Sequence, residues 1–377
     1  MPPIEQITTT QAIFQTNAYY VLCAGVFLIG TFLGSFFNVA IYRIPAGLSV
    51  SNPKRSFCFR CGSQVLWWQN IPVLSYFLLR GKCGSCGAPF SARYAAVELL
   101  TGALFLAIFV TTNPYGSETF QWATLWYLAF AGLLVVGTFT DIDHWIIPDG
   151  VTLGGAAAAL VAAGVIGVMD NYPLLSQFGP LPVVRERWGL DGLTMFISLM
   201  HGPQDADILP SQIHWWEPLA NAALGAAFGS ALLYSIGVLA KMILQKDAMG
   251  MGDVKLFAMI GATLGVTGTI LTLALACIFG AIAGGVMAGA AWLRRASGNP
   301  DAERAILKAG APDAMAEPEA ESLVSRITAA FQRAEDTGAS RGKPVHHLPF
   351  GPWIAAGALV VLIFQTPIRT MLANWIM

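Results

Sequence analysis

The feature that most constrains the fold is a series of long apolar runs spread over the whole chain. A helix needs about 20 residues to cross the ~30 Å hydrocarbon core of a bilayer. Six runs of about this length can be read, at 19–43, 95–113, 120–140, 150–169, 218–240 and 346–374. A seventh, 254–293, is about twice the spanning length and is interrupted at Gly265, Thr267 and Gly268, so we expect two helices there. With only 11% charged residues, the sequence predicts an all-α polytopic membrane protein with about eight transmembrane helices.

The distribution of Lys and Arg predicts the orientation of these helices. Residues 1–18 contain neither, whereas 44–94 contain six cationic residues and no acidic one: Lys54, Arg55, Arg60, Arg80, Lys82 and Arg93. Cytoplasmic loops beside membrane spans are enriched in Lys and Arg. We therefore expect 44–94 inside and the N-terminus outside, and alternation puts the loops at 114–119 outside and at 141–149, 241–253 and 294–345 inside.

Four of the six cysteines lie in the cationic segment 44–94 as two C-x-x-C pairs, Cys58 with Cys61 and Cys83 with Cys86. Each pair can supply two thiolates to a tetrahedral ion, and a glycine follows three of the four cysteines, as knuckle turns require. The 21 residues between the pairs slightly exceed the usual zinc-ribbon spacing. Two disulfides or two unrelated thiol pairs are the alternatives, but stable disulfides are rare in a reducing compartment. We predict a structural Zn²⁺ site in a small cytoplasmic domain.

Two carboxylates, Asp141 and Asp253, lie at the expected cytoplasmic ends of apolar runs. A carboxylate near hydrocarbon is costly and usually functional. Gly250 and Gly252 are expected to let the chain bend before Asp253 and approach a ligand closely, with a helix beginning at Val254. Taken alone, Asp253 could be an N-cap, with Lys255 as a headgroup anchor.

Together, Asp141 and Asp253 suggest aspartyl-protease chemistry. Two carboxylates a few Å apart cannot both ionise cheaply, so they share one proton. One can then activate water while the other protonates the carbonyl oxygen or the leaving group. Asp149, beside Pro148, is better explained as a helix-start residue. Asp143 is either a polar residue at headgroup level or a reserve candidate for the pair.

These expectations divide the chain into consecutive units. They are an outer N-terminal segment (1–18), a first transmembrane helix (19–43), a cytoplasmic zinc-binding domain (44–94), a transmembrane protease core (95–293) with an outer loop (170–217), a partly disordered cytoplasmic linker (294–345) and a last transmembrane helix (346–377).

As a set, these motifs resemble the type IV prepilin peptidases, also called prepilin leader peptidase/N-methyltransferases, among the GxGD aspartyl proteases. The matching blocks are Gly34 to Pro45, Cys58 to Ser75, Arg80 to Cys86, Ser91 to Glu98, Asp141 with Ile147-Pro148-Asp149, Gly250 to Leu256 and Pro349 to Pro352. By position, the family's catalytic pair falls on Asp141 and Asp253, and its metal ligands fall on the four cysteines. Gly250, Gly252 and Lys255 would support the catalytic loop.

The resemblance implies a bacterial inner-membrane enzyme that cleaves a short basic leader from type IV prepilins or type II secretion pseudopilins at the cytoplasmic face, commonly after Gly and before Phe. It also implies methylation of the new N-terminus with S-adenosylmethionine. No Gly-rich dinucleotide-like loop is visible, so the residues alone identify no methyl-donor site. Residues near the metal domain, including Asn70, Arg93 and Glu98, are the candidates to test for binding the methyl donor. They could equally have the structural role of packing the metal domain against the bilayer.

The expected partners are the prepilin substrate and membrane lipids, which the cationic segment 44–94 can attract; we expect no nucleic acid. Three other readings stay open. A proton- or cation-coupled transporter would also use membrane carboxylates and glycine-broken helices, but would not need paired thiol knuckles. A peptidase could lack the methyltransferase activity. A structural assembly factor would use the two aspartates only as helix caps.

Overall fold

The computed structural model of the chain describes residues 9–52, 55–58, 60–115, 123–171, 216–245, 250–296 and 349–364. Within these residues the regular structure is helical, with two isolated β-bridges. The elements are α1 (Thr9–Arg43), the short 3-10 helix η1 (Trp67–Asn70), α2 (Leu74–Leu78), α3 (Arg93–Thr112), α4 (Ala123–His144), α5 (Asp149–Asn171), α9 (Glu217–Leu244), α10 (Met251–Ala296) and α13 (Gly351–Ile363).

Six of the described helices, α1, α3, α4, α5, α9 and α10, are long and apolar enough to cross a membrane. The helix α10 is interrupted at Gly265, whose φ of 68° and ψ of −174° are not helical. This is where the sequence predicted two helices. The two parts of α10, the five preceding helices and the shorter apolar α13 account for the expected eight segments. The all-helical polytopic fold is confirmed.

Two boundaries differ from the sequence prediction at functionally important places. The helix α4 continues to His144, beyond the predicted end at residue 140, and α10 begins at Met251 rather than at Val254. The reason is that an apolar run marks the hydrocarbon, whereas backbone hydrogen bonding continues past it, as from the Trp145 amide to the Asp141 carbonyl (2.9 Å). Most of the predicted outer loop and nearly all of the predicted linker lie outside the described residues.

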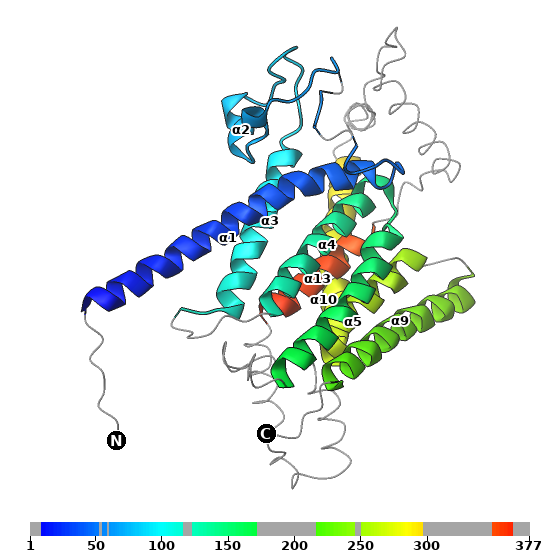
Figure 1. The fold of residues 1–377 in the computed structure, drawn as a ribbon. Coiled ribbons are helices and arrows are strands. Elements are labelled where there is room, and N and C mark those ends of the chain that lie inside the picture. Colours follow the sequence, from blue (N-terminus) through cyan, green and yellow to red (C-terminus); the bar gives the residue numbers. More distant parts are fainter. Residues whose placement is uncertain are drawn as a thin grey trace.

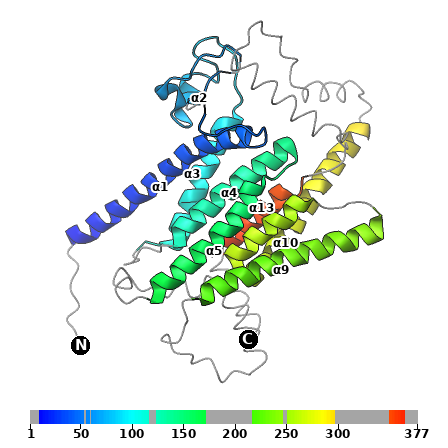
Figure 2. The same cartoon turned by 45° about the vertical axis from the view of Figure 1, so that its right-hand side comes forward.

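The helix α4 is central to the bundle. It packs against α1, α3, α5 and α13, and α10 packs against α5, α9 and α13 (Figures 1 and 2). Among the six candidate membrane spans, α4 has the largest fraction of buried residues. The core is built from large side chains of α4, α10 and α13, with Tyr127, Phe130, Phe257 and Ile354 almost completely buried. The segment around α2 lies at the end of the bundle where α1 ends and α3 begins (Figure 1).

The pair α9 and α10 shows how helices approach closely in this fold. A Cβ atom on Gly225 of α9 would overlap the Gly261 carbonyl of α10, and the reverse also holds. Small residues that let two backbones meet are typical of helix crossings in membranes. This crossing fixes the first part of α10, which carries Asp253.

Candidate active site and metal centre

Asp141 and Asp253 are brought to the same end of the bundle by different helices. Asp141 lies near the end of α4 and is 7% exposed, and Asp253 lies in the first turn of α10 and is partly buried. The two carboxylates are close enough to interact electrostatically. The third element at this point is α13, which begins at Gly351 beside Asp141.

The start of α13 forms one wall around the Asp141 carboxylate. A Cβ atom on Gly351 would lie 2.5 Å from Asp141 Oδ2, so only glycine leaves room for this carboxylate. The Gly351 amide favours the carboxylate, as does the positive end of a helix dipole. Asp141 Oδ2 is nevertheless buried and has no hydrogen-bond partner among the described residues. An oxygen in this state can take a proton or bind a water molecule.

Ile147, in the link between α4 and α5, joins the parts of the site. It is 7% exposed, and its side chain would be 3.5 Å from a Cβ on Gly252 and 3.2 Å from one on Gly351. It therefore packs against the first turns of both α10 and α13. The roles of Gly351 and Ile147 were not predicted from the sequence. Gly351 is followed by Pro352, which is a helix-start signal, but nothing local indicates its contact with Asp141.

The bend expected at Gly250 and Gly252 does not use the left-handed backbone conformation that favours glycine. Neither residue has a positive φ, and a Cβ on either would meet only ordinary contacts, the nearest atom to Gly250 being Asp253 Oδ2 at 3.8 Å.

Lys255, expected as a support residue or a headgroup anchor, pairs with another helix. Its Nζ lies 2.6 Å from Asp149 Oδ1. Asp149 is the first residue of α5, as predicted for a helix-start residue, so the pair ties the starts of α5 and α10 together.

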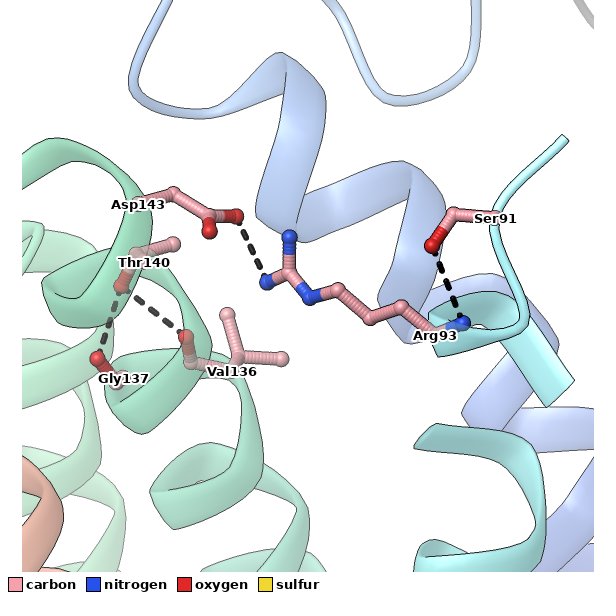
Figure 3. Close-up of polar contacts among 6 residues, drawn as sticks. All are labelled: Ser91, Arg93, Val136, Gly137, Thr140 and Asp143. Carbon is pink, nitrogen blue, oxygen red and sulfur yellow. Dashed lines mark hydrogen bonds and ion pairs between the residues drawn. The ribbon is translucent and has the colours of Figure 1, made fainter. Parts of the chain in front are cut away.

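Asp143 also has a cationic partner. Figure 3 shows the Arg93 side chain reaching from the start of α3 to α4, where its Nη2 lies 2.6 Å from Asp143 Oδ2. The Arg93 guanidinium carbon is also 5.0 Å from the centroid of the Phe139 ring. Asp143 therefore has a cationic partner of its own, and Asp141 and Asp253 remain the candidate pair.

The four paired cysteines gather in one cluster. The sulfur atoms of Cys58, Cys61, Cys83 and Cys86 all lie within 4.8 Å of one another, and Cys58 Sγ is 3.9 Å from Cys86 Sγ. Tetrahedral Zn–S bonds of about 2.3 Å place sulfurs about 3.8 Å apart. The four residues thus fit a single metal ion, as the sequence predicted.

Each cysteine pair lies in its own backbone turn, and the two turns have the same hydrogen-bonding pattern. The Cys58 amide donates to the Ser63 carbonyl (2.9 Å) and the Gly62 amide to the Cys58 carbonyl (2.8 Å). The second turn repeats this pattern from Cys83 to Ala88 (2.8 Å) and from Gly87 to Cys83 (2.9 Å). In each turn the residue four positions after the first cysteine is a glycine with a φ of 68°, a conformation that favours glycine.

The surroundings of the two cysteine pairs also shift the pKa values of their thiols. Amide hydrogen bonds from Cys86 and Ser85 lower the pKa of the Cys83 thiol to about 6. Burial raises the pKa of the Cys58 thiol to about 11. Cys83 therefore loses its proton more readily than Cys58 when a metal binds.

A cavity of about 600 Å³ lies between the metal domain, α1 and α3. Its walls include Asn38, Tyr42, Asn70, Tyr94 and Glu98. Two of the three residues singled out for the methyl-donor neighbourhood, Asn70 and Glu98, therefore line a cavity, and Arg93 pairs with Asp143 instead.

Glu98 also has a structural role in this cavity wall. The buried Glu98 carboxylate accepts the Val73 amide at 2.7 Å, which attaches the metal domain to α3.

Comparisons with known proteins agree with these observations. A model described as the Bacterial Peptidase A24 N-terminal domain matches residues 28–112, which contain the metal cluster. A model described as the Type IV leader peptidase family matches residues 193–285, which contain Gly250 to Asp253. Asp141 lies between the two matched regions. No solved structure matches the chain.

Several known proteins are similar to this chain over most of its length. The chain is 32% identical over 282 residues to the prepilin leader peptidase/N-methyltransferase of Aeromonas hydrophila, covering 69% of this chain and 79% of the relative. For Neisseria gonorrhoeae the identity is 30% over 283 residues, covering 69% and 80%. For Myxococcus xanthus it is 32% over 264 residues, covering 70% of this chain and 62% of the relative. On this similarity, the chain belongs to the prepilin leader peptidase/N-methyltransferase family.

Proposed function

We propose that the chain is a membrane aspartyl endopeptidase that removes the leader peptide of type IV prepilins or type II secretion pseudopilins at the cytoplasmic membrane face. The observation that carries the proposal is that Asp141 of α4 and Asp253 of α10 lie at the same end of the bundle, close enough for their charges to interact, with Asp141 beside the start of α13. The substrate class comes from the relatives, which are prepilin leader peptidase/N-methyltransferases.

The mechanism follows from one proton shared by two carboxylates. The ionised member takes a proton from a water molecule as the water oxygen attacks the scissile carbonyl carbon. The protonated member donates its proton to the carbonyl oxygen, and a tetrahedral intermediate forms. When the C–N bond breaks, the leaving nitrogen takes the proton from the protonated member, and the other carboxylate accepts a hydroxyl proton from the intermediate as the carbonyl reforms, so that the pair again holds one proton. Asp141 Oδ2, which is buried and has no hydrogen-bond partner among the described residues, is suited to hold the shared proton.

The test is cleavage of a purified prepilin in detergent by Asp141→Asn and Asp253→Asn. Each change keeps the side-chain shape but removes the acid, so we expect each to lower kcat by about 1,000-fold or more. Glu118→Gln, in the loop predicted to be outside, is the matched control and should cleave normally. Wild-type cleavage by both Asn variants would reject the protease. Loss of cleavage with intact folding and metal content would remove the reasons for a transporter or a scaffold.

A second candidate activity, N-methylation with S-adenosylmethionine as donor, is favoured by the cavity beside the metal domain. Its volume of about 600 Å³ is in the range of small-molecule sites, and its aromatic and amide walls suit an adenosine-sized group. The cavity walls include neither Asp141 nor Asp253. The proposal therefore has two separate sites.

Separate sites predict separable losses. Asn70→Leu, which fills part of the cavity, should lower methylation by about 10-fold or more and leave cleavage unchanged. Asp253→Asn should lose cleavage and still methylate a pilin supplied without its leader. A mass spectrum of the pilin N-terminus measures both events. If every variant lost both activities together, the two-site proposal would be wrong.

We further propose that the ion held by the four cysteines is Zn²⁺ in a structural role, since four thiolates are a ligand set typical of structural zinc. The membrane is proposed to be the bacterial cytoplasmic membrane, with the N-terminus outside. The cationic segment 44–94 would then face anionic lipids, with each cation contributing about 1 kcal/mol.

A further inference from the structure

The contact between Arg93 and α4 joins the metal domain's end of α3 to the helix that carries Asp141. Arg93 is the first residue of α3 and lies seven residues after Cys86, the last cysteine of the second pair. Its guanidinium reaches Asp143 at 2.6 Å (Figure 3), and it lies over the Phe139 ring at 5.0 Å. Asp143 and Phe139 are four residues apart, so they lie on one face of α4.

Asp141 lies on the opposite face of the same turn. It is two residues from both Phe139 and Asp143, which corresponds to a rotation of about 200° around the helix. On that side it meets Gly351 of α13. The last turn of α4 is therefore held between Arg93 on one face and the candidate active site on the other.

The start of α3, which carries Arg93, is attached to the metal domain. Its amide donates to Ser91 Oγ at 3.2 Å, at the entry to α3. Five residues further along α3, Glu98 accepts the amide of Val73 from the metal domain at 2.7 Å. The segment 44–94 has no acidic residue of its own, so the Arg93 cation finds its carboxylate on α4.

We propose that Arg93 is a positioning residue for leader cleavage. By holding Asp143 and Phe139, it sets the last turn of α4 so that Asp141 faces Asp253, and it makes cleavage depend on the folded metal domain. This rests on the proposed function of the Asp pair. The Arg93 and Asp143 side chains are 40% and 26% exposed, and partly exposed ion pairs add little stability. The expected effect is therefore on geometry, where displacement by about 1 Å can cost up to about 100-fold in rate.

The experiment compares Arg93→Gln, Asp143→Asn, the double variant and Arg93→Lys in the full chain, with Arg55→Gln as the matched control. Arg55 is an exposed cation of the same domain. We expect the first two variants to lower kcat by about 10-fold or more with KM nearly unchanged. The double variant should be no worse than either single variant, because both remove one interaction. Arg93→Lys should recover part of the rate, because it keeps the charge but not the planar contact.

A second readout does not depend on activity. Hydrogen exchange of the peptide 137–145 should become faster in Arg93→Gln and in Cys58→Ser, whose metal domain is damaged, and should not change in Arg55→Gln. Exchange elsewhere in α4 and in α10 should stay slow. Faster exchange in all helices together would mean that Arg93 maintains the fold in general, and the positioning role would be rejected.

The outcomes also separate this proposal from the proposed function. Wild-type kcat in Arg93→Gln and Asp143→Asn, with Asp141→Asn and Asp253→Asn inactive, rejects the positioning role and keeps the protease. Normal cleavage by both Asn variants of the pair rejects the protease and with it the role assigned to Arg93.

Discussion

At the scale of single residues, the surroundings of Asp141 depend on a residue that has no side chain. A Cβ atom at Gly351 would lie 2.5 Å from Asp141 Oδ2 and 3.1 Å from its carboxyl carbon, so Gly351→Ala has to displace either the carboxylate or the start of α13. We expect this variant to lose about 100-fold in kcat on a purified prepilin. Gly154→Ala is the control, since a Cβ there meets nothing within 4 Å. Normal cleavage by Gly351→Ala would show that α13 does not restrict the carboxylate.

The sequence indicates which residues are candidates for the site better than it indicates which residues they contact. Asp141, Asp253 and the four cysteines stand out because carboxylates near hydrocarbon and C-x-x-C pairs are unusual. The contacts of Asp141 with Gly351 and of Asp143 with Arg93 join residues far apart in the chain, and no local pattern encodes them.

At the scale of elements, the metal cluster is built from two equivalent turns. Each C-x-x-C pair lies in a turn with the same hydrogen-bonding pattern and supplies two of the four sulfurs. Cys58→Ser and Cys83→Ser should therefore lower bound zinc to a similar extent, from about one ion per chain to near zero. Elemental analysis measures this, and Cys277→Ser on α10 is the control outside the cluster. Active wild-type protein without metal would reject the zinc assignment.

The helices show why element boundaries were harder to predict than the elements themselves. Hydropathy located every described span, and the interruption at Gly265 was found from three residues that disfavour a continuous apolar helix. Hydropathy could not show that α4 and α10 extend past the apolar runs to carry Asp141 and Asp253 inside helical turns. Helix ends depend on backbone hydrogen bonds that continue into polar sequence.

At the scale of the whole molecule, the metal domain and the Asp pair share one end of the bundle. The ion pair between Arg93 and Asp143 joins the start of α3 to the end of α4. The opposite end is marked by Asn113 and Thr124, whose side chains are 2.8 Å apart, where α3 ends and α4 begins. The orientation of the metal domain therefore decides on which side of the membrane the Asp pair lies.

The excess of cations in 44–94 predicts that this shared end is cytoplasmic. Cysteine reporters test it, because Trp67 in the metal domain is 79% exposed and Tyr115 at the opposite end is 56% exposed. A membrane-impermeant maleimide should label Tyr115→Cys in intact spheroplasts, and Trp67→Cys only in inverted vesicles, with the wild-type chain unlabelled in spheroplasts. The reverse pattern would place Asp141 and Asp253 outside, where a leader that remains in the cytoplasm could not reach them.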